Sequence, residues 1–180
     1  MKKFTLLTAM LVFLGISTML NAQTSPSDKL FEKYNGKEGF TTVSISKELF
    51  GMFASLDTTD ADAKQMKEMM SQLNYIRIVM YETDKENDPT LASFKDELGK
   101  LNLTGFSELM TVNEKGENVK FLALKKGDKI GELLLVINSG KEAGFITING
   151  NIDVNTISKL SKSMHMEGME QLEKLNEEKK

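Results

Sequence analysis

A chain of 180 residues that has no cysteine and a formal net charge of −3 excludes several classes of function at once. Without a thiol it forms no disulfide, holds no thiolate-bound metal and supports no thiol redox chemistry. The acidic balance, with Arg77 as the one arginine, argues against nucleic acid as a partner, because that binding depends on Lys and Arg contacts to phosphate.

The first 22 residues have the pattern of a secretory signal peptide. Lys2 and Lys3 precede an apolar run over residues 4–20, and Ala22 supplies the small residue of a cleavage site. The alternative is a membrane anchor, but the run is shorter than the ~20 apolar residues of a spanning helix. We predict cleavage after Ala22 and a product in the periplasm or outside the cell, with no stable membrane insertion. A lipid anchor would need a cysteine, so that route is excluded.

The first predicted element after this segment is a helix. It opens at Ser25-Pro26 and closes at Asn35-Gly36, because a serine cap, an early proline and a terminal glycine are start and stop signals. A half-buried strand over residues 40–45 follows, with alternate residues on one side. Those residues are Thr41, Val43 and Ile45.

Two further helices come next, the first capped by Ser46. Each has an apolar stripe at helical spacing, which predicts a buried side. The stripes are Leu49, Phe53 and Leu56 in the first helix, and Met66, Met69, Met70 and Leu73 in the second. A strand is then predicted over residues 75–81. Asp88-Pro89 opens another helix, because aspartate is a good cap and proline suits the first turn. That helix is lined by Leu91, Phe94, Leu98 and Leu101.

Four strand-like runs joined by short turns make up the next part of the chain, and they predict an antiparallel meander. They cover residues 106–112, 118–124, 130–137 and 144–149. The third run is apolar from Leu133 to Ile137, which predicts a central strand covered on both faces. On the first run, the helix-free face is predicted to carry one of two alternating sets. The sets are Phe106, Glu108 and Met110, or Ser107, Leu109 and Thr111.

A final helix capped by Asp153 is predicted, with Val154, Ile157, Leu160 and Met164 facing inward. The order of elements predicts an α+β fold, with a mainly antiparallel sheet and helices packed on one face. We expect a single domain over residues 23–165, followed by a charged tail over residues 166–180 that is partly helical or disordered.

Three stretches of the chain resemble a bacterial domain of unknown function, family 4252. They are residues 38–50 around Phe40-Thr-Thr-Val-Ser-Ile45, residues 106–110, and Phe145-Ile-Thr-Ile-Asn-Gly150. The likeness covers residues 27–165. It implies a compact exported envelope domain of Bacteroidetes-type bacteria. It brings no catalytic residues, because none are assigned to the family.

Two groups of side chains are candidate sites. The first is Met164, His165, Met166 and Met169, whose thioethers and imidazole suit copper(I). Neighbours on a helix point about 100° apart, so this group also fits a core position beside a solvent-facing histidine. The second is Met66, Met69 and Met70, which fits either a core stripe or an adaptable surface for a partner.

No catalytic constellation is recognisable in the sequence. Glu108 and Glu132 interrupt predicted strands and are expected to point to solvent. We therefore predict a non-catalytic binding, structural or regulatory module of the cell envelope, with another envelope protein as partner and no cofactor. Two alternatives stay open: a hydrolytic enzyme that uses acidic residues, and a periplasmic copper-binding protein.

Overall fold

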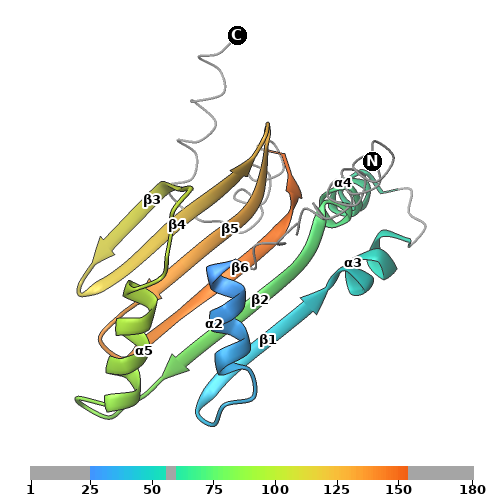
Figure 1. Ribbon diagram of the computed structural model, residues 1–180. Helices are drawn as coiled ribbons and strands as arrows, with labels where there is room; N and C mark the ends of the chain where they lie inside the picture. Colours follow the sequence, from blue (N-terminus) through green and yellow to red (C-terminus); the bar gives the residue numbers. More distant parts are fainter. Residues whose placement is uncertain (1–24, 56–59, 154–180) are drawn as a thin grey trace, which may run out of the picture.

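The protein folds around one six-stranded antiparallel sheet, as a computed structural model shows (Figure 1). The structure describes residues 25–55 and 60–153. The strand order is β1-β2-β6-β5-β4-β3, and every neighbouring pair is antiparallel. The strands are β1 (Phe40–Ser46), β2 (Leu73–Glu82), β3 (Phe106–Glu114), β4 (Glu117–Lys126), β5 (Lys129–Asn138) and β6 (Glu142–Ile152). This sheet and its helices confirm the predicted α+β fold. The signal segment, the last predicted helix and the tail lie outside the described residues.

The second half of the sheet is the expected meander, in which β3, β4, β5 and β6 follow one another as hairpins. The β3–β4 turn places Lys115 and Gly116 at positive φ, 46° and 88°, which is the backbone that a tight hairpin turn requires. β6 then pairs with β2, so the meander and the antiparallel pair β1–β2 form one continuous sheet.

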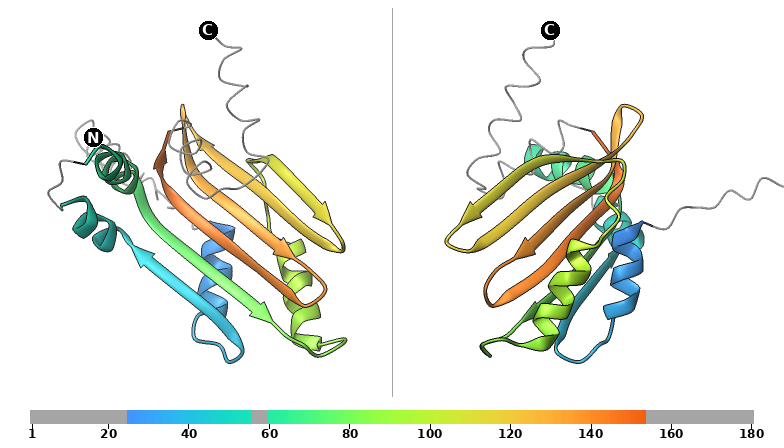
Figure 2. Two further views of the ribbon diagram at one scale, coloured as in Figure 1. Left: turned by 180° about the vertical axis from the view of Figure 1, so that it is seen from behind. Right: turned by 60° about the vertical axis from the view of Figure 1, so that its left-hand side comes forward.

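One face of the sheet is covered by two helices, α2 (Pro26–Tyr34) and α5 (Pro89–Gly99), which lie side by side on it (Figure 2). The largest core cluster lies between these helices and the sheet. Its centre includes Phe94 of α5 and Phe145 of β6, both fully buried. The ring of Phe94 lies edge-on to those of Tyr34 and Phe40, with centroids 4.7 and 5.1 Å away, a favourable aromatic geometry.

The start of α5 follows the sequence signal closely. The Asp88 carboxylate accepts hydrogen bonds from the backbone N–H groups of Thr90 and Leu91, at 2.8 and 3.1 Å. These bonds lower the pKa of Asp88, because they favour the charged carboxylate. Leu91, Phe94 and Leu98 face the core as predicted, whereas Leu101 packs against the core from beyond the helix end.

The other two helices, α3 (Lys47–Ala54) and α4 (Ala61–Ser71), contact each other at one end of β1 and β2 (Figure 1). They belong with a second, smaller core cluster, in which Phe50 is 6% exposed. The predicted inward direction of Leu49 and Phe53 is wrong, since both are exposed, and Leu56 of the same predicted stripe lies outside the described residues. Leu73 is also not helical, because β2 begins there. In α3 the packing of Phe50 against Ile45 and Ile76, rather than helical periodicity alone, decides which residue turns inward, whereas Leu73 is buried as predicted.

The face of the sheet opposite α2 and α5 is called the second face below. Residues that alternate along a strand share a face, and the register therefore gathers an almost wholly apolar set on it. The set comprises Thr41, Val43 and Ile45 of β1; Ile76, Ile78 and Met80 of β2; Ile146 and Ile148 of β6; Leu133, Leu135 and Ile137 of β5; Val119, Phe121 and Ala123 of β4; and Met110 and Val112 of β3.

A β-bulge corrects the prediction for β3. Glu108 pairs with Leu122, but Met110 pairs with Phe121, so one extra residue sits between them. The bulge changes which way the strand alternates, and neither predicted set shares a face. Phe106 packs against the helix-covered core, whereas Leu109 packs against the smaller cluster. β5 is central as predicted. On its second face Leu133, Leu135 and Ile137 are only partly buried.

Candidate functional site

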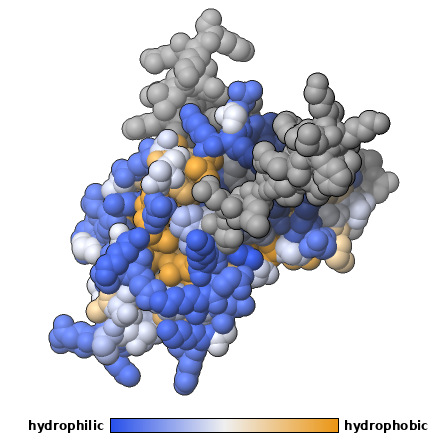
Figure 3. All heavy atoms as spheres, viewed as in Figure 1, coloured by the Kyte–Doolittle hydropathy of each residue, from blue (hydrophilic) through white to orange (hydrophobic). Residues whose placement is uncertain are grey.

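An open groove runs beside the first turn of α2, with a volume of about 920 Å³. It lies between α2, the residues that follow α5, and the ends of β3 to β6 that lie near them. Its larger apolar side chains are Leu30, Leu101, Phe106 and Leu124, and Figure 3 shows apolar surface in the hollow between hydrophilic surroundings. Four lysines also line it: Lys29, Lys100, Lys125 and Lys126.

The most unusual residue of the groove is Glu132, whose side chain is 2% exposed. In β5 it shares a face with Leu134, and that face looks toward α2 and α5. Its Oε1 accepts hydrogen bonds from the hydroxyls of Ser25 and Ser27, at 2.7 and 2.6 Å. Burial raises the pKa of Glu132, because it penalises the charged carboxylate. The expectation that Glu132 faces solvent is therefore wrong. Glu108 is exposed, as expected.

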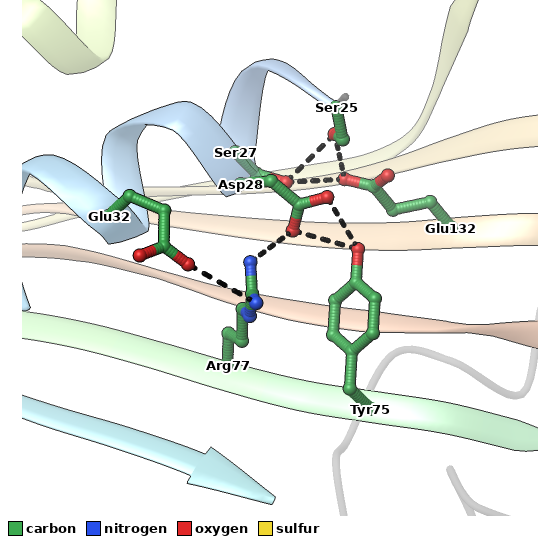
Figure 4. A network of polar contacts seen from close by, with 7 residues as sticks. All are labelled: Ser25, Ser27, Asp28, Glu32, Tyr75, Arg77 and Glu132. Carbon is green, nitrogen blue, oxygen red and sulfur yellow. Dashed lines mark hydrogen bonds and ion pairs between the residues drawn. The ribbon is translucent and has the colours of Figure 1, made fainter. Parts of the chain in front are cut away.

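A second carboxylate, Asp28, directly follows Ser27 in the first turn of α2 (Figure 4). It accepts hydrogen bonds from the Tyr75 hydroxyl at 2.8 Å and from Arg77 Nη1 at 2.9 Å. The Arg77 guanidinium also lies 4.7 Å from the Phe31 ring centre and 3.4 Å from a Glu32 oxygen. Burial, and secondly the Asp28 carboxylate, raise the pKa of the Tyr75 hydroxyl. These contacts tie α2 to β2.

The two carboxylates hold two adjacent groups of polar contacts, which meet on the first turn of α2 and together make up the network that Figure 4 shows between α2, β2 and β5. At the start of α2 the hydroxyls of Ser25 and Ser27 donate to Glu132 of β5, so they bind the sheet and do not cap the helix. Ser25 makes no capping bond of its own. The dominant role of the network is therefore to fix α2 on the sheet. A buried carboxyl group whose pKa is raised, close to a second carboxyl group, is also an arrangement that supports acid–base chemistry.

The methionine cluster predicted from the sequence is divided by the structure. In α4, Met69 is 8% exposed and joins the core, Met70 is intermediate, and Met66 is 43% exposed. Met66 belongs to a different group of exposed side chains, which we call the α3–α4 surface. It comprises Leu49, Met52 and Phe53 of α3 and Met66 of α4, which are 41, 68, 49 and 43% exposed.

The copper candidates Met164, His165, Met166 and Met169 lie outside the described residues. Within residues 25–55 and 60–153, no group of three or more His, Cys, Asp or Glu side chains is placed to hold a metal ion. In the same ranges, none of the helices combines the length and apolar character that crossing a membrane requires.

Sequence reasoning missed the network around Glu132. One signal was present: Glu132 is an acid directly before the apolar run 133–137, where a charge is unusual. The partners gave no signal, because Ser25 and Asp28 look like ordinary helix-start residues. Their contact with β5 and β2 spans about a hundred and about fifty positions, respectively, and sequence spacing does not reveal it.

Comparison with protein families gives one match. A family model described as "Domain of unknown function (DUF4252)" matches residues 34–160, more than half of the chain. Comparison with curated proteins gives no match, and comparison with solved structures gives none either.

Proposed function

The chain belongs to this family of domains of unknown function, and from that premise we propose that it is an exported, non-catalytic binding module of the cell envelope. The α3–α4 surface docks another envelope protein. Export rests on the signal pattern of residues 1–22, and docking rests on the exposure of large apolar side chains. Such side chains gathered in one place usually mark an interaction site.

The observation that carries the proposal is the grouping of these side chains. Six large apolar residues of the described part are markedly exposed, and four of them lie on two short helices that contact each other. The buried Phe50 and Met69 hold the two helices in place. Because these two residues already supply core contacts of the helices, the exposed residues face solvent in the folded state.

The residue types also favour a protein partner. Methionine and aromatic residues are enriched in the cores of protein–protein interfaces, and charged residues surround such cores. Met52 is the most exposed of the set, at 68%, and Phe53 lies beside it. Lys47, Glu48 and Lys67, all exposed, supply charges of both signs on the same two helices. This mixture suits a protein surface better than an anionic membrane, which would favour clustered lysines.

Charge substitution tests the proposal. In the double variant Met52→Glu and Phe53→Glu, capture of the partner from crosslinked envelopes should fall by about tenfold or more, because two hot-spot side chains become charged. Val112→Glu is the matched control: Val112 is 41% exposed but lies on β3, away from α3 and α4. Equal capture by the wild type and the double variant would refute docking through this surface.

A hydrolytic function at the groove is the second candidate, and one observation favours it. Glu132 and Asp28 both line the groove, and burial raises the pKa of Glu132. We rank it below binding, because Glu132 is 2% exposed and both carboxylates already hold protein donors. Turnover of chromogenic ester or glycoside substrates that disappears in Glu132→Gln would support it. Turnover that is absent, or equal in both proteins, would reject it.

A further inference from the structure

The described helices cover only one end of the second face, where Phe50 of α3 and Met70 of α4 pack in the smaller core cluster, and the rest of this face needs another cover. One row across it consists of Ile78, Ile146, Leu135, Phe121 and Met110, which pair in turn across five strands. All five side chains are only partly buried. α2 and α5 lie on the opposite face (Figure 2). An antiparallel sheet that faces water on one side normally shows polar residues there, so a wholly apolar row indicates a packed face.

The chain leaves the described fold beside this face. Ile152, the last residue of β6, is fully buried in the smaller core cluster. Asp153 is then tied down by Gln72: its N–H donates to Gln72 Oε1, and Gln72 Nε2 donates to its carboxylate, both at 3.0 Å. The cluster contains Ile148 and Leu133, which belong to the second face. The following residues therefore start next to the uncovered row.

The sequence beyond this point has the pattern that the row requires. Val154, Ile157, Leu160 and Met164 recur at helical spacing after Asp153, which is a good helix cap. A helix over residues 154–164 would be about 16 Å long at 1.5 Å per residue. Strands lie ~4.8 Å apart, so this length crosses three to four of them. The family match continues to residue 160, so the family unit itself includes most of this stretch.

We propose that residues 154–164 form a helix that packs across the second face, with Val154, Ile157, Leu160 and Met164 on the row through Leu135. The occupant of this face is the chain's own C-terminal segment, and the sheet is then enclosed by helices on both sides. The proposal uses none of the exposed side chains of the α3–α4 surface, so this inference does not depend on the proposed function.

Engineered disulfides test the proposal, and no native thiol competes with them, because the chain has no cysteine. In the full chain carrying Leu160→Cys and Leu135→Cys, mild oxidation should give an intramolecular disulfide, detected by mass and by faster migration on non-reducing gels. Two matched controls should not link. Lys162→Cys with Leu135→Cys moves the thiol to the far side of the helix, and Leu160→Cys with Lys29→Cys uses an exposed residue of α2 on the opposite face.

The outcomes separate the possible occupants. A disulfide between two chains through Leu135→Cys would show that a second copy covers this face, and would overturn the proposal. Equal linking in all three pairs, or no linking in any, would also overturn it. In a separate variant with Leu135→Cys alone, adding Leu160→Asp should raise the rate of maleimide labelling by about tenfold or more, because an aspartate cannot take the place of a buried leucine. An unchanged rate would contradict the proposal.

Discussion

Replacing Glu132 by glutamine should make the protein more stable at neutral pH and leave it nearly unchanged in acid. Burial raises the pKa of Glu132 in the folded state above its value in the unfolded chain. Stability from such a group is fully present below the unfolded pKa and is lost as the pH rises through the folded pKa. Glutamine cannot ionise, and its Oε1 can still accept the two serine hydroxyls. The variant therefore avoids that loss.

The magnitude follows from the proton linkage. Each tenfold change in the proton affinity of the folded state corresponds to ~1.4 kcal/mol of stability, and the difference between the two proteins should approach a plateau above the folded pKa. Alanine behaves differently, because it removes the acceptor. Ser25 and Ser27 lie 2.9 Å apart and can bond each other, so one hydroxyl loses its partner. Glu132→Ala should cost about 1–3 kcal/mol, the cost of one buried unpaired donor.

Urea unfolding followed by far-UV circular dichroism, repeated from pH 4 to pH 8, measures both effects. The free energy of unfolding of Glu132→Gln minus that of the wild type should rise with pH, and Glu132→Ala should be less stable than Glu132→Gln at every pH. A difference between Glu132→Gln and the wild type that is flat over this range would refute the reasoning, because it would mean that Glu132 titrates alike in the folded and unfolded states.

Three further substitutions probe the core, the sheet and the surface. Phe94→Ala should lower the free energy of unfolding by about 3–5 kcal/mol in urea melts, because the ring is fully buried; a loss under 1 kcal/mol would contradict its central place. Gly144→Ala should cost about 1–3 kcal/mol, since the new Cβ would lie 2.5 Å from a carbonyl oxygen of β2, whereas Gly140→Ala meets open space and is the control. Lys33→Ala should lower the free energy of unfolding by less than about 1 kcal/mol, because the Lys33 side chain is half exposed. The ion pair with Lys33 lowers the pKa of Glu97, so NMR titration should show that this pKa rises in the variant.

Much of the fold was predictable where local chemistry and tertiary packing agree. The α5 start at Asp88-Pro89 is an example, because the cap and the proline act within one turn. The meander was predictable for the same reason, since each hairpin turn is specified by residues next to it.

The parts that sequence could not supply depend on partners far along the chain. The inward direction of Glu132 is set by the register of β5 against β6 and by serines of α2. The burial of Phe50 in place of Leu49 and Phe53 is set by where β1 and β2 meet the helix. The bulge in β3 shifts the alternation by one residue, and no residue type at Glu108–Met110 announces it. Hydrophobic periodicity identifies the apolar side of a helix or strand, but it does not say which side the neighbouring elements cover.

The proposed docking role of the α3–α4 surface is tested most directly by photocrosslinking in living cells. A photoreactive phenylalanine analogue at Phe53, which is 49% exposed, should give a discrete adduct with one envelope protein after irradiation. The same analogue at Val112, 41% exposed on β3, should give none. A discrete adduct at Phe53 alone is the result that this account predicts. No adduct at Phe53, or the same adduct at both positions, would contradict it.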